Sequence, residues 1–81
     1  MTGEAIRAKR ARQRISGYAL CSRVGISRGR LSEIETGRHT PAQEELARID
    51  ATLEELIRTK RTLSRIAVEL GWPDGVEVVT R

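Results

Sequence analysis

The segment VGISRGRLSEIETG, residues 24–37, decides the fold. Gly25 can adopt the positive φ that ends one helix, and Ser27 can cap the next. Leu31 and Ile34 are three residues apart, so a helix over residues 28–35 has one apolar side. Gly37 can end that helix. Two helices joined by so short a turn predict a helix-turn-helix.

The flanking sequence adds helices on both sides of this segment. Residues 3–14 predict a leading helix, and Ser16 is a cap for a short helix over residues 17–24. On the other side, Thr40 is the expected cap of a fourth helix that has Pro41 at its first position.

No Gly or Pro interrupts residues 42–70. Apolar residues follow there at alternating spacings of three and four, the pattern of a heptad seam. They are Leu46, Ile49, Leu53, Leu56, Leu63, Ala67 and Leu70, with Lys60 as the polar gap. A straight helix of this length spans about 43 Å, and a domain of this size is only about 30 Å across. The helix therefore either breaks around Thr59–Thr62 or projects to meet a partner.

The expected fold is an all-α bundle of about five helices with a long C-terminal helical segment. A short strand or extended tail at Val76–Val79 follows it. We expect a DNA-binding unit over residues 1–56, and a C-terminal helix and tail over residues 57–81.

Length and composition exclude several classes of protein. The chain has 81 residues, 38% of them hydrophobic, so we expect neither a disordered tail nor a second domain. Its single cysteine cannot form a disulfide within the chain. We expect no signal peptide and no membrane span, and hence a cytoplasmic location in a bacterial nucleoid or a phage-infected host.

Charge is divided unequally along the chain. Nine Lys and Arg against three acidic residues give residues 1–40 a net charge of +6, and residues 41–81 carry −2. Eight of the nine cations are Arg, which suits bidentate contacts to phosphate and guanine. The first half is therefore expected to meet a polyanion, the alternative being a solvated basic surface.

Several motifs resemble the Cro/CI-type, lambda-repressor-like (XRE) helix-turn-helix family of phage and bacterial regulators. Leu31-Ser32-Glu33-Ile34-Glu35-Thr36-Gly37 with Pro41 is similar to its I-S-x-I-E-x-G…P signature. Gly25-Ile26-Ser27 is similar to its G-[VIL]-S turn. The resemblance covers residues 4–56. It departs at Gly17, where the family usually has the Gln that contacts a phosphate and braces the recognition helix.

The resemblance implies double-stranded DNA as the partner, read in the major groove by residues 28–35. The exposed positions there give the base contacts Arg28, Gly29, Arg30 and Glu33. Glu33 either accepts from a cytosine or orients Arg28 or Arg30. Gly29 either permits close approach to DNA or is tolerated in a short helix. Phosphate contacts are expected from helix N-termini and loops, at Arg14, Ser16, Gly17, Tyr18, Ser27, Arg38 and Thr40.

The resemblance also implies that Arg10 and Glu35 form an ion pair tying the first helix to the third. No metal, cofactor, small-molecule ligand or enzymatic activity is expected. His39 is the only histidine, and Cys21 has no activating base in its sequence context.

The C-terminal half supports two hypotheses. In the first, a phage-type repressor or Cro-like regulator dimerises, so that two recognition helices read half-sites about 34 Å apart. The expected interface residues are Leu56, Lys60, Leu63, Ile66, Ala67 and Leu70. In the second, an antitoxin-like module docks another protein on Leu56, Ile57, Leu63, Ile66 and Val68, with DNA binding secondary. A third reading keeps Leu63, Ile66 and Leu70 for a fifth helix folded back on the core.

Overall fold

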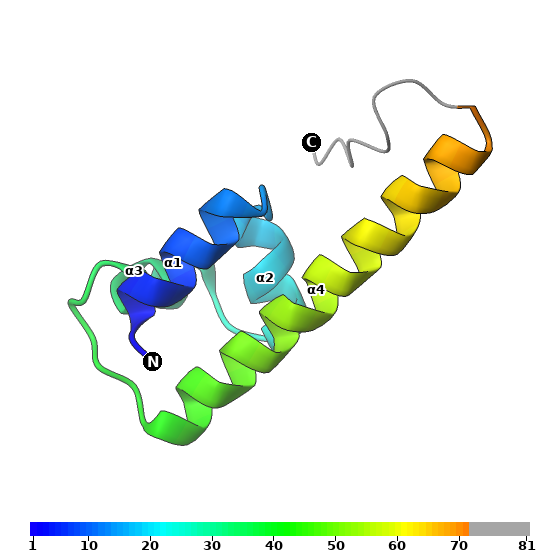
Figure 1. Ribbon diagram of the computed structural model, residues 1–81. Helices are drawn as coiled ribbons and strands as arrows, with labels where there is room; N and C mark the ends of the chain where they lie inside the picture. Colours follow the sequence, from blue (N-terminus) through cyan, green and yellow to red (C-terminus); the bar gives the residue numbers. More distant parts are fainter. Residues whose placement is uncertain (72–81) are drawn as a thin grey trace.

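The computed structural model describes residues 1–71, and these residues form four helices (Figure 1). They are α1 (Gly3–Arg12), α2 (Gly17–Val24), α3 (Arg28–Glu35) and α4 (Gln43–Glu69). The expected all-α fold with a long C-terminal helix is confirmed, with four helices in this part of the chain rather than about five. The predicted extended tail at Val76–Val79 lies outside the described residues.

Serine caps begin α2 and α3, and one glycine ends α2. Ser16 and Ser27 accept hydrogen bonds from the backbone N–H groups of Ala19 and Arg30, at 3.0 and 3.1 Å. Gly25 ends α2 with a φ of 88°. These capping positions were predicted correctly, because each rests on a local requirement for a side-chain oxygen or a left-handed residue.

The start of α4 differs from the prediction. The first helical residue is Gln43, and Ala42 occupies the capping position without a side-chain bond. The carbonyl of Ala42 accepts from the N–H groups of Glu45 and Leu46, at 3.0 and 3.1 Å. Thr40 is exposed outside the helix, and Pro41 is buried in the loop instead of opening α4. Burial of Pro41 holds the chain against the bundle before the helix begins.

Helix α4 is a single rod that continues through the Thr-rich segment where a break was considered. Thr62 donates its hydroxyl to the carbonyl of Arg58, four residues earlier, at 3.1 Å. A β-branched residue can be held in a helix by such a bond, so the threonines do not interrupt it. The rod makes the molecule elongated, with extents of 44 × 22 × 20 Å.

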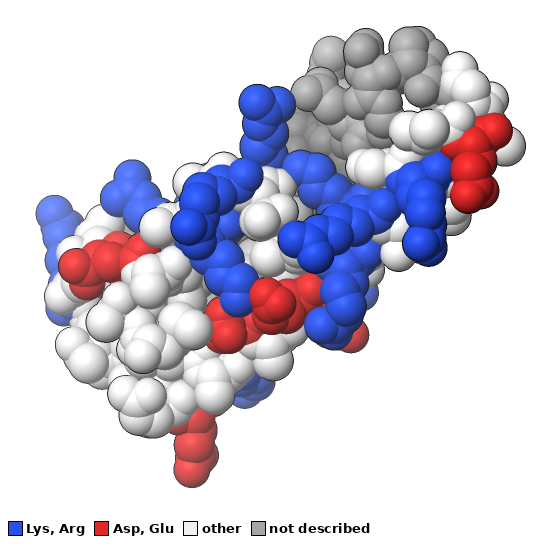
Figure 2. All heavy atoms as spheres, in the orientation of Figure 1, with Lys and Arg blue, Asp and Glu red and all other residues white. Residues whose placement is uncertain are grey.

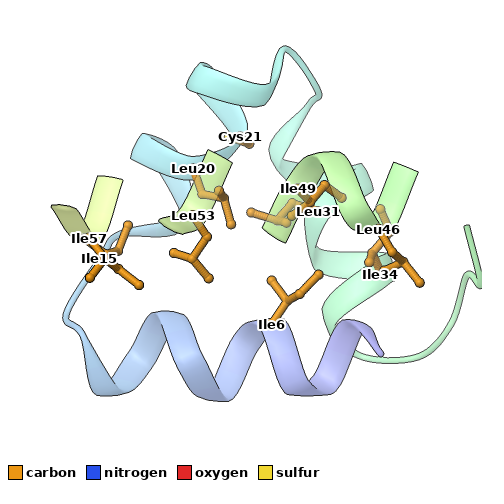
Figure 3. Packing of buried hydrophobic residues seen from close by; sticks show 10 residues of the cluster. All are labelled: Ile6, Ile15, Leu20, Cys21, Leu31, Ile34, Leu46, Ile49, Leu53 and Ile57. Carbon is orange, nitrogen blue, oxygen red and sulfur yellow. The ribbon is translucent and has the colours of Figure 1, made fainter. Parts of the chain in front are cut away.

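One apolar core lies between α4 and the three short helices (Figure 3). Its α4 side consists of Leu46, Ile49, Leu53 and Ile57, the positions that a helical period of three and four residues places on one face. Opposite them lie Ile6, Ile15, Leu20, Cys21, Leu31 and Ile34. The core ends at Ile57, so the last three turns of α4 extend beyond the other helices (Figure 1).

Candidate nucleic-acid interface

Helix α3 has one side anchored in the core and one side exposed to solvent. Leu31 and Ile34 are only 3% and 1% exposed. Arg28, Gly29 and Glu33 lie on the exposed part of the same helix. Because the aliphatic side chains fix the rotation of α3, its cationic side is held outward.

Arg30, the fourth base-contact candidate, is turned toward α4. Its Nε and Nη2 donate to the two carboxylate oxygens of Glu45, at 2.9 and 2.6 Å. This guanidinium lowers the pKa of Glu45 from its ordinary value. No hydrogen bond or ion pair joins Glu33 to Arg30 in the described residues, so Glu33 does not orient Arg30 directly. The first turn of α4 lies beside the start of α3 and supplies the carboxylate.

Gly29 is exposed, and almost nothing in the described chain packs against it. A Cβ added there would meet only the hydroxyl oxygen of Ser27, at 4.0 Å. No packing inside the described chain therefore requires glycine at this position, although glycine weakens a helix.

A surface hollow of about 290 Å³ lies among α1, the start of α2 and α3. It brings two expected DNA contacts, Gly17 and Arg28, to one place. The other residues that line it are Arg7, Arg10, Ser32, Glu35 and Thr36. Since Gly17 has no side chain, nothing from the start of α2 fills this space.

Some of the residues expected to contact phosphate lie at helix starts, where the two serine hydroxyls are engaged as caps. Ser16 and Ser27 use their Oγ atoms as caps, so a phosphate at these sites would meet backbone N–H groups. Tyr18 is 62% exposed in the first turn of α2. Arg14, just after α1, is exposed and has a left-handed φ of 54°.

The structure brings Arg10 and Glu35 together. Arg10 Nε and Nη2 donate to Glu35 Oε2 and Oε1, both at 2.8 Å, and Nη1 donates to the carbonyl of Ile15 at 3.0 Å. The Glu35 carboxylate raises the pKa of Arg10. Glu35 is only 5% exposed, so this bidentate contact joins α1 to the end of α3 at the edge of the core.

Residues 3–55 match the model of a family described as a helix-turn-helix domain. The chain belongs to this family. The comparison with curated proteins gives no significant match, and neither does the comparison with solved structures. Family membership confirms the Cro/CI-like resemblance and implies DNA binding, and the family is typically non-enzymatic.

The loop after α3 of this helix-turn-helix domain exposes Arg38, His39 and Thr40. The N–H of His39 donates to the carbonyl of Glu33 at 3.1 Å, which holds the loop against the end of α3. Within residues 1–71, no three His, Cys, Asp or Glu side chains gather as metal ligands would. No helix of that part is long and apolar enough to cross a membrane. The thiol of Cys21 is buried.

The expected dimer residues divide into two groups. Leu56 packs against the core, Ala67 is buried, and Lys60 Nζ donates to the carbonyl of Gln13 at 2.7 Å. In contrast, Leu63, Ile66 and Leu70 are 38%, 43% and 61% exposed. For the protein-interaction alternative, Val68 is also exposed, whereas Ile57 is buried in the core and unavailable for docking.

Three residues that line the hollow were not predicted as neighbours of the expected contacts, namely Arg7, Ser32 and Thr36. Arg7 lies three residues before Arg10 and therefore on the same side of α1. Ser32 lies four residues after Arg28, and Thr36 lies four residues after Ser32. The Thr36 hydroxyl donates to the Ser32 carbonyl at 2.8 Å. Helical spacing from Arg10 and Arg28 would have predicted all three residues.

Proposed function

We propose that this chain is a sequence-specific double-stranded DNA-binding transcriptional regulator, of the phage-repressor or Cro-like kind, that places α3 in the major groove. The single observation that carries the proposal is the orientation of α3. Leu31 and Ile34 anchor the helix, and Arg28, Gly29 and Glu33 remain exposed. A helix of this diameter fits the major groove and presents such side chains to base edges.

In this proposal Arg28 is the principal base reader. An Arg donates bidentately to guanine O6 and N7, and Arg28 has no ion-pair partner in residues 1–71. Glu33 would accept from a cytosine on the same side of the helix. Arg30 reaches DNA only by leaving Glu45, so it contributes less to base selection than Arg28.

Backbone phosphates would bind around this centre. The starts of α2 and α3 offer free N–H groups at Gly17 and beside Ser27, where the helix dipole favours an anion. Tyr18, Arg14, Arg38 and Thr40 extend the contact on either side. The hollow beside Gly17 has Arg7 and Arg28 on its border. A phosphate would bind there, in the space left by the Gln side chain that the family usually has at this position.

Enrichment of binding sequences from sheared genomic DNA, followed by gel shifts at physiological salt, tests the proposal. We expect one motif to be enriched. Arg28→Ala should cost about 1–3 kcal/mol on that motif and relax selection at one base pair. Arg38→Ala should weaken all sequences alike. Arg61→Ala, which removes an equal charge from the far end of α4, is the matched control.

The absence of an enriched motif would contradict specific readout. An equal loss for Arg28→Ala and Arg61→Ala would contradict the assigned role of α3, because it would mean that net charge alone binds DNA. We assign DNA binding to residues 1–56 and association with a second copy to residues 57–81. The boundary between these regions falls inside α4, which makes the rod part of both.

A further inference from the structure

The end of α4 beyond Ile57 exposes an apolar stripe formed by Leu63, Ile66 and Leu70. These residues follow at spacings of three and four, so they lie on one side of the helix. Their exposed fractions are 38%, 43% and 61%. We propose that a second copy of this chain covers the stripe and that the two α4 helices pair antiparallel. The inference rests on the proposed function, since it specifies how that regulator assembles.

A parallel pair is opposed by the packing of Leu56 against the core. Continued toward the N-terminus of α4, the apolar stripe runs through Thr52 and Leu56. Leu56 already packs against the core, and Thr52 is half-buried. A parallel partner would have to occupy the side of α4 on which Leu56 already packs against the core. An antiparallel partner overlaps only the free ends, and its own bundle lies beyond the end of the first rod.

Charge selects the register of this antiparallel pair. With Leu63 opposite the partner's Ile66, Leu70 faces the partner's Thr59, and every apolar side chain of the stripe is covered. Glu69 then lies on the same flank as the partner's Arg58, about 3 Å away along the helix axis, and the symmetry repeats this attraction. Glu69 and Arg58 are exposed and have no ion pair within residues 1–71.

The neighbouring register is disfavoured. Sliding the partner until Leu56 faces the partner's Ile66 brings Glu55 opposite the partner's Glu69. It also brings Lys60 against the partner's Lys60. Like charges at flanking positions destabilise a helix pair, and such positions usually decide orientation and partner choice.

This pairing sets the distance between the two recognition helices. The start of α3 is held beside Glu45 by Arg30. At 1.5 Å per residue, Glu45 and the partner's Glu45 lie about 60 Å apart along the paired rods. That separation is nearer two turns of DNA, about 70 Å, than one turn of about 34 Å. The operator half-sites are then two turns apart, in place of the single turn first expected.

Sedimentation of the full chain tests the interface. The unchanged protein should be a dimer, and Ile66→Asp should raise the dissociation constant at least about 30-fold, because it buries a charge in the stripe. Val68→Asp is the matched control, since Val68 is 68% exposed and lies off the stripe. Circular dichroism verifies that both variants stay helical. A monomeric parent, or equal dissociation by both variants, overturns the proposal.

Orientation and register have their own measurements. A spin label at Ala51→Cys, in a Cys21→Ala background, should give an inter-copy distance of about 40 Å for the antiparallel pair. A parallel pair would give about 15–20 Å. Glu69→Arg and Arg58→Glu should each weaken the dimer a few-fold, and the double variant should recover. The short distance, or a double variant weaker than both single ones, contradicts the proposal.

DNA binding by Ile66→Asp separates this inference from the proposed function. The monomer should still bind one half-site and lose the cooperative binding of two half-sites placed two turns apart. If the parent protein binds DNA as a monomer, the dimer is wrong and the regulator stands. If a verified dimer binds no DNA motif, the regulator is wrong and the interface stands.

Discussion

Gly3 of α1 lies against the backbone of Ile34 in α3. A Cβ added to Gly3 would come within 1.9 Å of the Ile34 carbonyl oxygen and 2.6 Å of its carbon. No side chain can occupy that space unless the two helices separate. The first turn of α1 therefore sets the depth at which the last turn of α3 is seated.

We expect Gly3→Ala to destabilise the fold by about 1–3 kcal/mol, the usual cost of an added methyl group in a packed site. Urea unfolding measures this difference. This loss is what remains after the gain in helix propensity is subtracted, because alanine is a better helix former than glycine. Equal stability of the variant and the parent would mean that α1 is free to move away from Ile34.

Gly29→Ala should act with the opposite sign on stability. Position 29 is exposed and borders open space, so alanine should stabilise the isolated protein by about 1 kcal/mol through helix propensity. DNA binding should weaken at the same time, because the methyl group comes between α3 and the groove. Parallel unfolding and gel-shift measurements separate the two effects. Stabilisation without weaker binding would leave the glycine merely tolerated.

Replacing only one partner of the Arg10–Glu35 pair should destabilise the fold. Arg10→Met strands a carboxylate that is 5% exposed, and we expect a loss of about 3 kcal/mol. That is the low end for a buried pair, since water still reaches part of Arg10. Combining Arg10→Met with Glu35→Leu should recover much of the loss. Additive losses in the double variant would show that the two side chains act independently.

Stability should depend on pH through Glu45. Arg30 lowers the pKa of this carboxyl in the folded state, below the 4.5 of an unperturbed glutamate. The stabilisation is therefore complete above about pH 4.5 and disappears as the pH falls through the lowered value. Comparing the unfolding of the parent and Glu45→Gln isolates this contribution from those of other carboxyls. Their difference should shrink below pH 4.5, and a constant difference would contradict the pairing.

Local signals made the first part of the fold predictable. Ser16, Gly25 and Ser27 act within four residues of their own positions, so the sequence displays their roles directly. The predicted start of α4 was wrong, because the true start depends on the burial of Pro41, which is a tertiary contact. The continuity of α4 through Thr62 was left open, since threonine neither prohibits nor demands a break.

The candidate site was predictable to a different extent. Residues along one side of α3 follow from helical spacing. The hydrogen bonds between Arg30 and Glu45 join residues fifteen positions apart, and no local sequence pattern indicates them. The contact of Gly3 with Ile34 was missed for the same reason. A glycine inside a predicted helix gives no indication of which distant backbone it approaches.

The unbroken rod has a mechanical consequence. One end of α4 holds Arg30 through Glu45, and the other end carries the stripe that a second molecule would grip. A rod held at both ends in this way would pass a twist applied near Leu70 to the start of α3. Under the proposed function, a change at Leu70 would thereby affect DNA binding from some 40 Å away, without touching the nucleic acid.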